Sequence, residues 1–135
     1  MANTGFSYTV TLSQSHLSWG THRYTGSRAT IYGEGYIPIP ASVAYSQNIF
    51  NSNGTNGQDI LGQNIFMCSS VDGYLKNVTM KAQGCTVAGS IYAKQFSANG
   101  NLKVLGQWYH QMNCQVGDSV RVTWASPTQI LIEKI

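Results

Sequence analysis

The sequence predicts a mainly β protein, an open barrel of seven or eight strands with one or two short helices. Apolar and polar residues alternate in several segments, which is the pattern of strands with one buried face. Helical spacing is confined to two short stretches, 41–47 and 107–113. The chain has 14 glycines and only 10% charged residues, a composition that favours short strands and turns. At 135 residues, without an internal repeat or a linker, residues 1–135 are predicted to form a single domain.

The clearest strand signal is near the start of the chain. In Phe6–Ser13, aromatic and aliphatic residues occupy every second position, and Ser or Thr residues occupy the others. A second strand is predicted at Ala29–Ile37, where Gly33 and Gly35 indicate a bulge or bend.

A short helix is predicted after these two strands. Pro40 suits the first helical turn, where its missing N–H would have no partner in any case. The helix spans Ala41–Phe50, with Val43, Ala44 and Gln47 on one stripe. The turn-rich segment Asn51–Gln58 is predicted to be a polar loop.

The middle of the chain predicts further strands. Ile65–Cys68 is a short apolar run, and Asp72-Gly73 suits a turn. Tyr74–Ala82 alternates, with Tyr74, Lys76, Val78, Met80 and Ala82 on one face and Leu75, Asn77, Thr79 and Lys81 on the other. The remaining elements predicted here are a strand in Thr86–Phe96, a hairpin turn at Asn99-Gly100 and a return strand at Leu102–Leu105.

The last residues predict a hairpin that closes the barrel. Gly117-Asp118 suits a tight turn, because glycine accepts a positive φ and aspartate can bond its own backbone. In Ser119–Trp124, the residues Val120, Val122 and Trp124 share one face. Ser126-Pro127-Thr128 interrupts the strand, and Gln129–Lys134 resumes it with Ile130 and Ile132 turned inward.

The charge and cysteine counts indicate the class of protein. The net charge is +3 with only five acidic residues, which permits a polyanionic partner. Cys68, Cys85 and Cys114 lie far apart without metal-ligand spacing, so we expect reduced thiols with neither disulfide nor zinc. With no signal peptide and no membrane-spanning run in the sequence, we expect an intracellular protein without membrane contact. No catalytic motif or carboxylate pair is evident, so we expect no enzyme activity and no cofactor.

The loop after the first strand has the composition of a nucleic-acid contact. Residues 15–28 place His16, Trp19, His22, Arg23, Tyr24 and Arg28 among small hydroxyl residues and two glycines. Cations interleaved with aromatic rings and hydroxyl groups suit phosphates and bases. A solvated loop with one or two rings packed against the barrel explains the same residues equally well.

The order of these elements resembles the B3-type DNA-binding pseudobarrel of plant transcription factors and of the recognition domains of some restriction endonucleases. The residues that carry the resemblance are Ile39-Pro40 with Val43–Phe50, and Trp108 followed by Val116-Gly117-Asp118 and Ser119–Trp124. The segment 51–64 is longer and more polar than that family leads us to expect.

The resemblance implies an open pseudobarrel that grips the major groove of double-stranded DNA with two arms. The first arm corresponds to Gly20–Arg28, with candidate residues His22, Arg23, Tyr24, Thr25, Ser27 and Arg28. Tyr24, like Trp19, fits a place in the core equally well. The second arm corresponds to Lys94–Lys103, with candidate residues Lys94, Gln95, Ser97, Asn99, Asn101 and Lys103. We expect Arg23 and Arg28 to lie close to Lys94 and Lys103 on one exposed edge. Arginine suits guanine, Asn and Gln suit adenine, and lysine suits phosphate.

Three function classes follow. The first is non-catalytic, sequence-specific binding of double-stranded DNA, with a nuclease on a separate chain as a fitting partner. The second is a β-barrel that binds a carbohydrate or another small ligand, which the many Tyr, Trp, Asn and Gln residues suit. The third is a structural or phage assembly protein. A steep salt dependence of binding would separate the first class from the other two.

Overall fold

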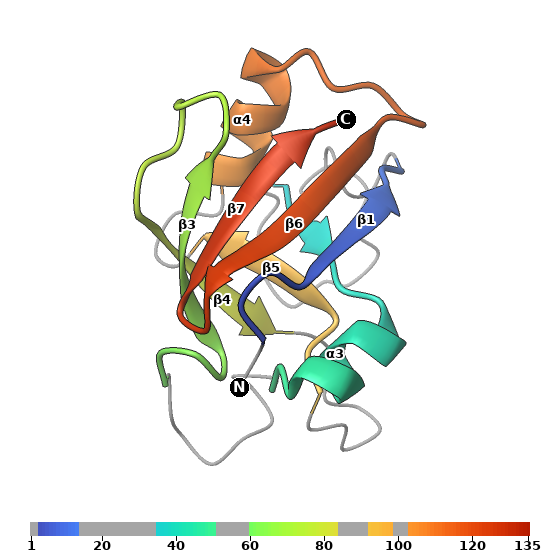
Figure 1. Cartoon of the computed structure of the whole chain (residues 1–135). Helices are drawn as coiled ribbons and strands as arrows, with labels where there is room; N and C mark the ends of the chain where they lie inside the picture. The colour runs from blue at the N-terminus through green and yellow to red at the C-terminus, as the bar shows by residue number, and fades with distance from the viewer. Residues whose placement is uncertain (1–2, 14–34, 51–59, 84–91, 99–102) are drawn as a thin grey trace, which may run out of the picture.

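The strands of the chain form one curved sheet. A computed structural model describes residues 3–13, 35–50, 60–83, 92–98 and 103–135. These residues contain β1 (Ser7–Thr11), β2 (Ile37–Pro38), α3 (Ala41–Gln47), β3 (Ile65–Ser70), β4 (Val78–Gln83), β5 (Gln95–Ala98), α4 (Val104–Gln111), β6 (Ser119–Ser126) and β7 (Gln129–Lys134). The seven strands lie in the order β1-β6-β7-β3-β4-β5-β2 and curl into a nearly closed barrel, as Figure 1 shows. The predicted mainly β open barrel with two short helices is confirmed.

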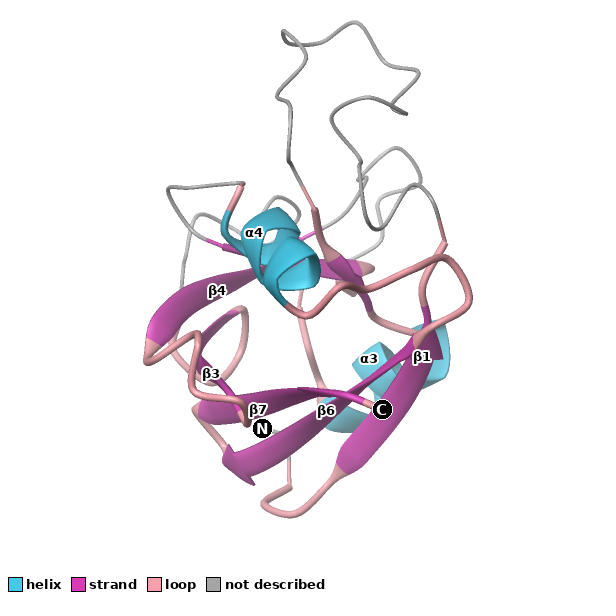
Figure 2. Ribbon diagram, turned by 90° about the horizontal axis from the view of Figure 1, so that it is seen from above, coloured by secondary structure: helices cyan, strands magenta, loops and turns pink. Residues whose placement is uncertain are grey.

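The strand directions define two ends of the barrel. Only β3 and β7 pair in parallel, while all the other neighbours pair antiparallel. Strands β1, β7, β3 and β5 therefore run one way, and β6, β4 and β2 run the other way. The end at which β1 and β5 finish is called the α4 end, and the opposite end is called the α3 end, after the helix that lies there (Figure 1). In Figure 2, seen from above, the strands curve around the core and α4 lies over one side.

A tyrosine side chain links the two edges of the sheet. The edge strands β1 and β2 are not paired with each other. The hydroxyl of the buried Tyr8 in β1 donates a hydrogen bond of 3.1 Å to the carbonyl oxygen of Pro38 in β2. Pro38 is tolerated in this strand because β2 is an edge, where a missing backbone donor breaks no ladder. The barrel is thus closed by a side chain where the backbone ladder stops.

Aromatic rings fill the centre of the barrel. Trp124 in β6 is fully buried, and its ring lies 5.8 Å from Phe6, 6.1 Å from Tyr8, 5.9 Å from Phe66 and 6.2 Å from Phe96, measured between centroids. These partners come from the start of β1, from β3 and from β5, so one indole connects strands from around the barrel. Its Nε1–H is buried and has no hydrogen-bond partner among the described residues.

Several predicted elements are confirmed with little change. The alternation of 6–13 forms β1, and the closing hairpin forms β6 and β7, with Val120, Val122, Trp124, Ile130 and Ile132 buried. Helix α3 buries the predicted stripe of Val43, Ala44 and Gln47. The predicted turns contain Gly73 and Gly117, which adopt φ values of +87° and +97°. Ile37 lies in β2, while residues 29–34 of that predicted strand lie outside the described residues, as do 51–58, 86–91 and 99–100.

Two predicted strands are wrong in part. The alternation of 74–82 is interrupted at Asn77, whose φ of +50° is not that of a strand, so β4 begins at Val78. As a result Leu75 is buried and Tyr74 is exposed, the reverse of the predicted faces. The predicted return strand 102–105 is also wrong where it is described, because Val104 and Leu105 begin α4. The helix predicted at 107–113 therefore starts and ends earlier than expected.

Replacing Tyr8 with phenylalanine tests the bond between the two edges. The variant keeps the ring but leaves the Pro38 carbonyl without its donor, so we expect the free energy of unfolding to fall by about 0.5–1.5 kcal/mol in urea denaturation. Tyr74→Phe is the matched control, because the Tyr74 side chain is 48% exposed and its change should leave stability unaltered. Equal stability of Tyr8→Phe and the wild type would show that this bond does not hold the edges together.

Candidate nucleic-acid interface

Helix α4 presents a polar face at the α4 end. Leu105, Trp108 and Tyr109 are buried, and they lie on one side because residues three and four apart share a helix face. The opposite side consists of exposed residues that can donate hydrogen bonds, namely Lys103, Gln107, His110 and Gln111. Such side chains suit phosphates and base edges.

Two buried rings fix the position of α4. The Nε1–H of Trp108 donates a hydrogen bond of 2.9 Å to Asp72 in the turn between β3 and β4. The hydroxyl of Tyr109 donates one of 2.7 Å to the carbonyl oxygen of Tyr36, just before β2. The helix is therefore anchored to two separated parts of the barrel, which leaves its polar face in a fixed orientation.

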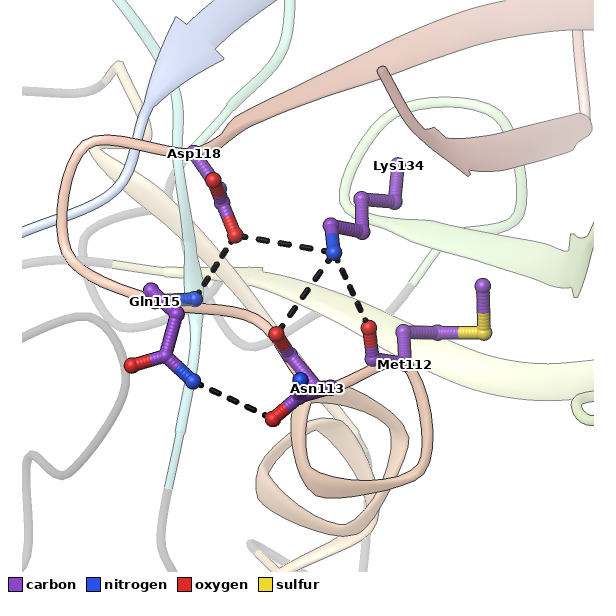
Figure 3. Close-up of polar contacts among 5 residues, drawn as sticks. All are labelled: Met112, Asn113, Gln115, Asp118 and Lys134. Carbon is purple, nitrogen blue, oxygen red and sulfur yellow. Dashed lines mark hydrogen bonds and ion pairs between the residues drawn. The ribbon is translucent and has the colours of Figure 1, made fainter.

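The carboxyl-terminal end of α4 is bound to the closing hairpin. The ammonium of Lys134 in β7 donates hydrogen bonds to the carbonyl oxygens of Met112, at 3.1 Å, and Asn113, at 3.5 Å (Figure 3). A cation is favourable at this end of a helix, where carbonyl groups lack partners. Lys134 also lies 3.6 Å from the carboxylate of Asp118, which accepts a hydrogen bond of 2.8 Å from the backbone N–H of Gln115.

Each acidic side chain in the described residues has a partner. Asp118 pairs with Lys134, and Glu133 lies 3.5 Å from Arg121. Asp72 accepts hydrogen bonds from the Trp108 indole, the Tyr74 backbone and the Ser70 hydroxyl. Burial acts to raise the pKa of Asp72, but these bonds stabilise the carboxylate and lower the pKa below its usual value. Two of the three described carboxylates are therefore paired with cations, and the third accepts hydrogen bonds from neutral groups.

The predicted contact residues of the second segment are divided between the two ends. Lys94 is exposed and precedes β5, so it lies toward the α3 end, whereas the exposed Lys103 follows β5 at the α4 end. The expected proximity of Arg23 and Arg28 to both lysines involves residues outside the described part of the chain, and β5 separates Lys94 from Lys103. Gln95 is half-buried in β5, and Ser97 is buried with a hydrogen bond from the amide of Gln83. The buried Ser97 side chain has no surface to offer a ligand.

The other predicted contact residues lie outside the described part of the chain. They are His22, Arg23, Tyr24, Thr25, Ser27, Arg28, Asn99 and Asn101. Sequence reasoning also missed three exposed donors of α4, which are Gln107, His110 and Gln111. Their signal was present, because Lys103, Gln107 and Gln111 recur every four residues opposite the apolar positions.

The two described cysteines, Cys68 and Cys114, are free thiols with raised pKa values. Cys68 is buried and Cys114 is half-buried, and neither forms a disulfide. Burial raises the pKa of Cys68 to about 12, and burial is also the main cause of the raised pKa of Cys114. Both therefore remain thiols at neutral pH, which are poor nucleophiles and metal ligands. No group of three His, Cys, Asp or Glu side chains within the described ranges is placed to hold a metal ion.

Comparison of the chain with protein-family models, with curated protein sequences and with solved structures gives no significant match. None of the helices in the described segments is long and apolar enough to span a membrane.

Removing the Lys134 ammonium tests its role at the end of α4. We expect Lys134→Met to lower the free energy of unfolding by about 1 kcal/mol, because it loses the bonds to two helix carbonyls. Arg121→Met is the matched control on the neighbouring strand. Its ion pair is 48% and 39% exposed, so we expect a loss below about 0.5 kcal/mol. Equal losses in urea denaturation would contradict a special role for Lys134.

The lowered pKa of Asp72 predicts a pH dependence of stability. A carboxyl group whose pKa is lower in the folded state stabilises the fold above its unfolded pKa of about 3.9, and this contribution is lost as the pH falls through the folded value. We therefore expect Asp72→Asn to be less stable than the wild type at pH 7, and the difference to shrink below about pH 4. Urea denaturation across this range measures it. A difference that is constant with pH would show that the Asp72 charge does not contribute.

Proposed function

We propose that this chain is a non-catalytic module that binds a specific sequence in double-stranded DNA through the α4 end of the barrel. The observation that best supports this proposal is the direction of the strands. Strands β1 and β5 finish at the same end, so Ser13, the last described residue before the basic and aromatic segment 15–28, lies at the end that holds Lys103 and α4. Two segments far apart in the sequence can therefore contribute to one surface.

The charge distribution supports a polyanionic ligand at this end. Asp118 of the α4 end is paired with Lys134, which reduces its repulsion toward phosphates, whereas Asp72 keeps its negative charge in its hydrogen bond with Trp108. Lys103 supplies a positive charge, and the exposed Gln and His side chains of α4 supply further hydrogen-bond donors.

The order of elements also supports the proposal. The described chain runs through two strands, a helix that follows Pro40, three strands, a helix that contains Trp108, a Gly-Asp turn and a closing hairpin. This order is in keeping with the resemblance to the B3-type pseudobarrel. The proposed contact residues are those of 22–28 with Asn99, Asn101 and Lys103, together with Gln107, His110 and Gln111. A nuclease on a separate chain remains the partner that this function would suit.

A duplex-binding assay with a randomised DNA library at two salt concentrations tests the proposal. We expect Arg23→Ala to weaken binding to the selected sequence by about 1–3 kcal/mol and to relax the sequence preference. Lys103→Ala should weaken binding to all sequences alike and reduce the salt slope by about one unit, because it removes one phosphate contact.

Lys94→Ala is the matched control. It removes an exposed lysine from the other end of β5, so it should bind the library as the wild type does. Absence of duplex binding at low salt would overturn the proposed function. Equal effects of the two lysine variants would show that binding depends on net charge alone, and would overturn the assignment to the α4 end.

A further inference from the structure

The α3 end carries a cluster of three aromatic rings that the proposed DNA surface does not use. The ring of Tyr92 lies 5.7 Å from Phe50, nearly parallel at 22°, and 5.5 Å from Tyr45 at 57°. Tyr45 is 69% exposed, while Phe50 and Tyr92 are half-buried. These three residues are called the tyrosine platform. A large aromatic side chain so exposed covers little of the core and leaves its ring available for contact with a ligand.

The backbone holds the platform in place. Helix α3 ends at Asn48, which adopts a left-handed φ of +55°, and the next residue, Ile49, is fully buried. The backbone of Ile49 accepts a hydrogen bond from Ala93 and donates one to Ala44. Phe50 then forms a β-bridge with Tyr92, which sets the two rings side by side. Rings ordered in this way before binding cost a ligand little conformational entropy.

Helix α3 and the described residues on either side of it, 35–50, carry no charged side chain. The sequence from Gly35 to Gln58 contains no Asp, Glu, Lys or Arg. The exposed positions of α3 and its cap carry hydroxyl and amide groups, at Ser42, Ser46 and Asn48. Lys94, two residues after Tyr92, is a single cation, too few to attract a polyanion strongly. An aromatic face bordered by neutral donors and acceptors suits a ligand with one apolar face and several hydroxyl groups.

We propose that the tyrosine platform binds a neutral carbohydrate, with the C–H face of a pyranose ring against Tyr45 and Tyr92. The hydroxyl and amide groups of α3 bond the sugar hydroxyls. This site lies at the end of the barrel opposite the proposed DNA surface, so it does not depend on that proposal.

Titration of the isotopically labelled protein with maltotriose, cellotriose and N,N′,N″-triacetylchitotriose, followed by NMR, tests the site. We expect saturable shifts around α3 and Tyr92 with at least one sugar, and affinity that is unchanged between about 50 mM and about 500 mM salt, because the ligand is uncharged. Tyr45→Ala should weaken binding at least about tenfold, whereas Tyr45→Phe should retain most of it because the ring face remains.

Tyr74→Ala is the matched control, since it removes a comparably exposed tyrosine from the turn at the α4 end. It should bind the sugar as the wild type does, and Tyr45→Ala should bind duplex DNA unchanged. The proposal would be overturned if none of the three sugars gave a saturable shift up to about 20 mM, a concentration well above a millimolar dissociation constant. Equal sugar binding by Tyr45→Ala and the wild type would also overturn it, as would an affinity that falls steeply with salt.

Discussion

The packing of aromatic rings around Trp124 is the interaction on which the rest of the barrel depends. The indole is fully buried in β6 and lies against rings from the β1 side and from β3 and β5. Backbone ladders join only neighbouring strands, so this cluster supplies contacts across the interior. Its Nε1–H has no partner in the described part of the chain, and an unpaired buried donor costs on the order of 1–3 kcal/mol. Burial of the large apolar ring offsets that cost.

The same sheet separates two kinds of chemistry. At the α4 end, hydrogen bonds of Trp108, Tyr109 and Lys134 connect the helix to three different parts of the barrel. These bonds fix the orientation of its exposed polar face. At the α3 end, helix α3 carries no charged residue, Lys94 is an exposed cation before β5, and Tyr45 is an exposed aromatic residue. Because the short strands keep these ends apart, a ligand at one end need not compete with a ligand at the other.

The sequence predicted best where one face of an element is buried along its whole length. The alternation of β1, β6 and β7 and the stripe of α3 are of this kind. Prediction failed where a distant contact decides the structure. Helix α4 begins at Val104, and its Trp108 ring donates a hydrogen bond to Asp72, a partner far away in the sequence. A polar residue such as Ser97 is expected at the surface, but a hydrogen bond from the Gln83 amide on the next strand allows it to be buried.

The contacts that fix α4 also engage the described carboxylates of the candidate interface. Asp118 forms an ion pair with Lys134, and the Lys134 ammonium also donates a hydrogen bond to a carbonyl oxygen at the end of α4. One carboxylate and one cation therefore take part in positioning the helix. Asp72 is held ionised by three hydrogen-bond donors, which lower its pKa but leave its negative charge in place. Of the two described carboxylates at this end, Asp118 is the one offset by a cation. The contact between Asp118 and Lys134 therefore both positions the end of α4 and reduces the negative charge beside it.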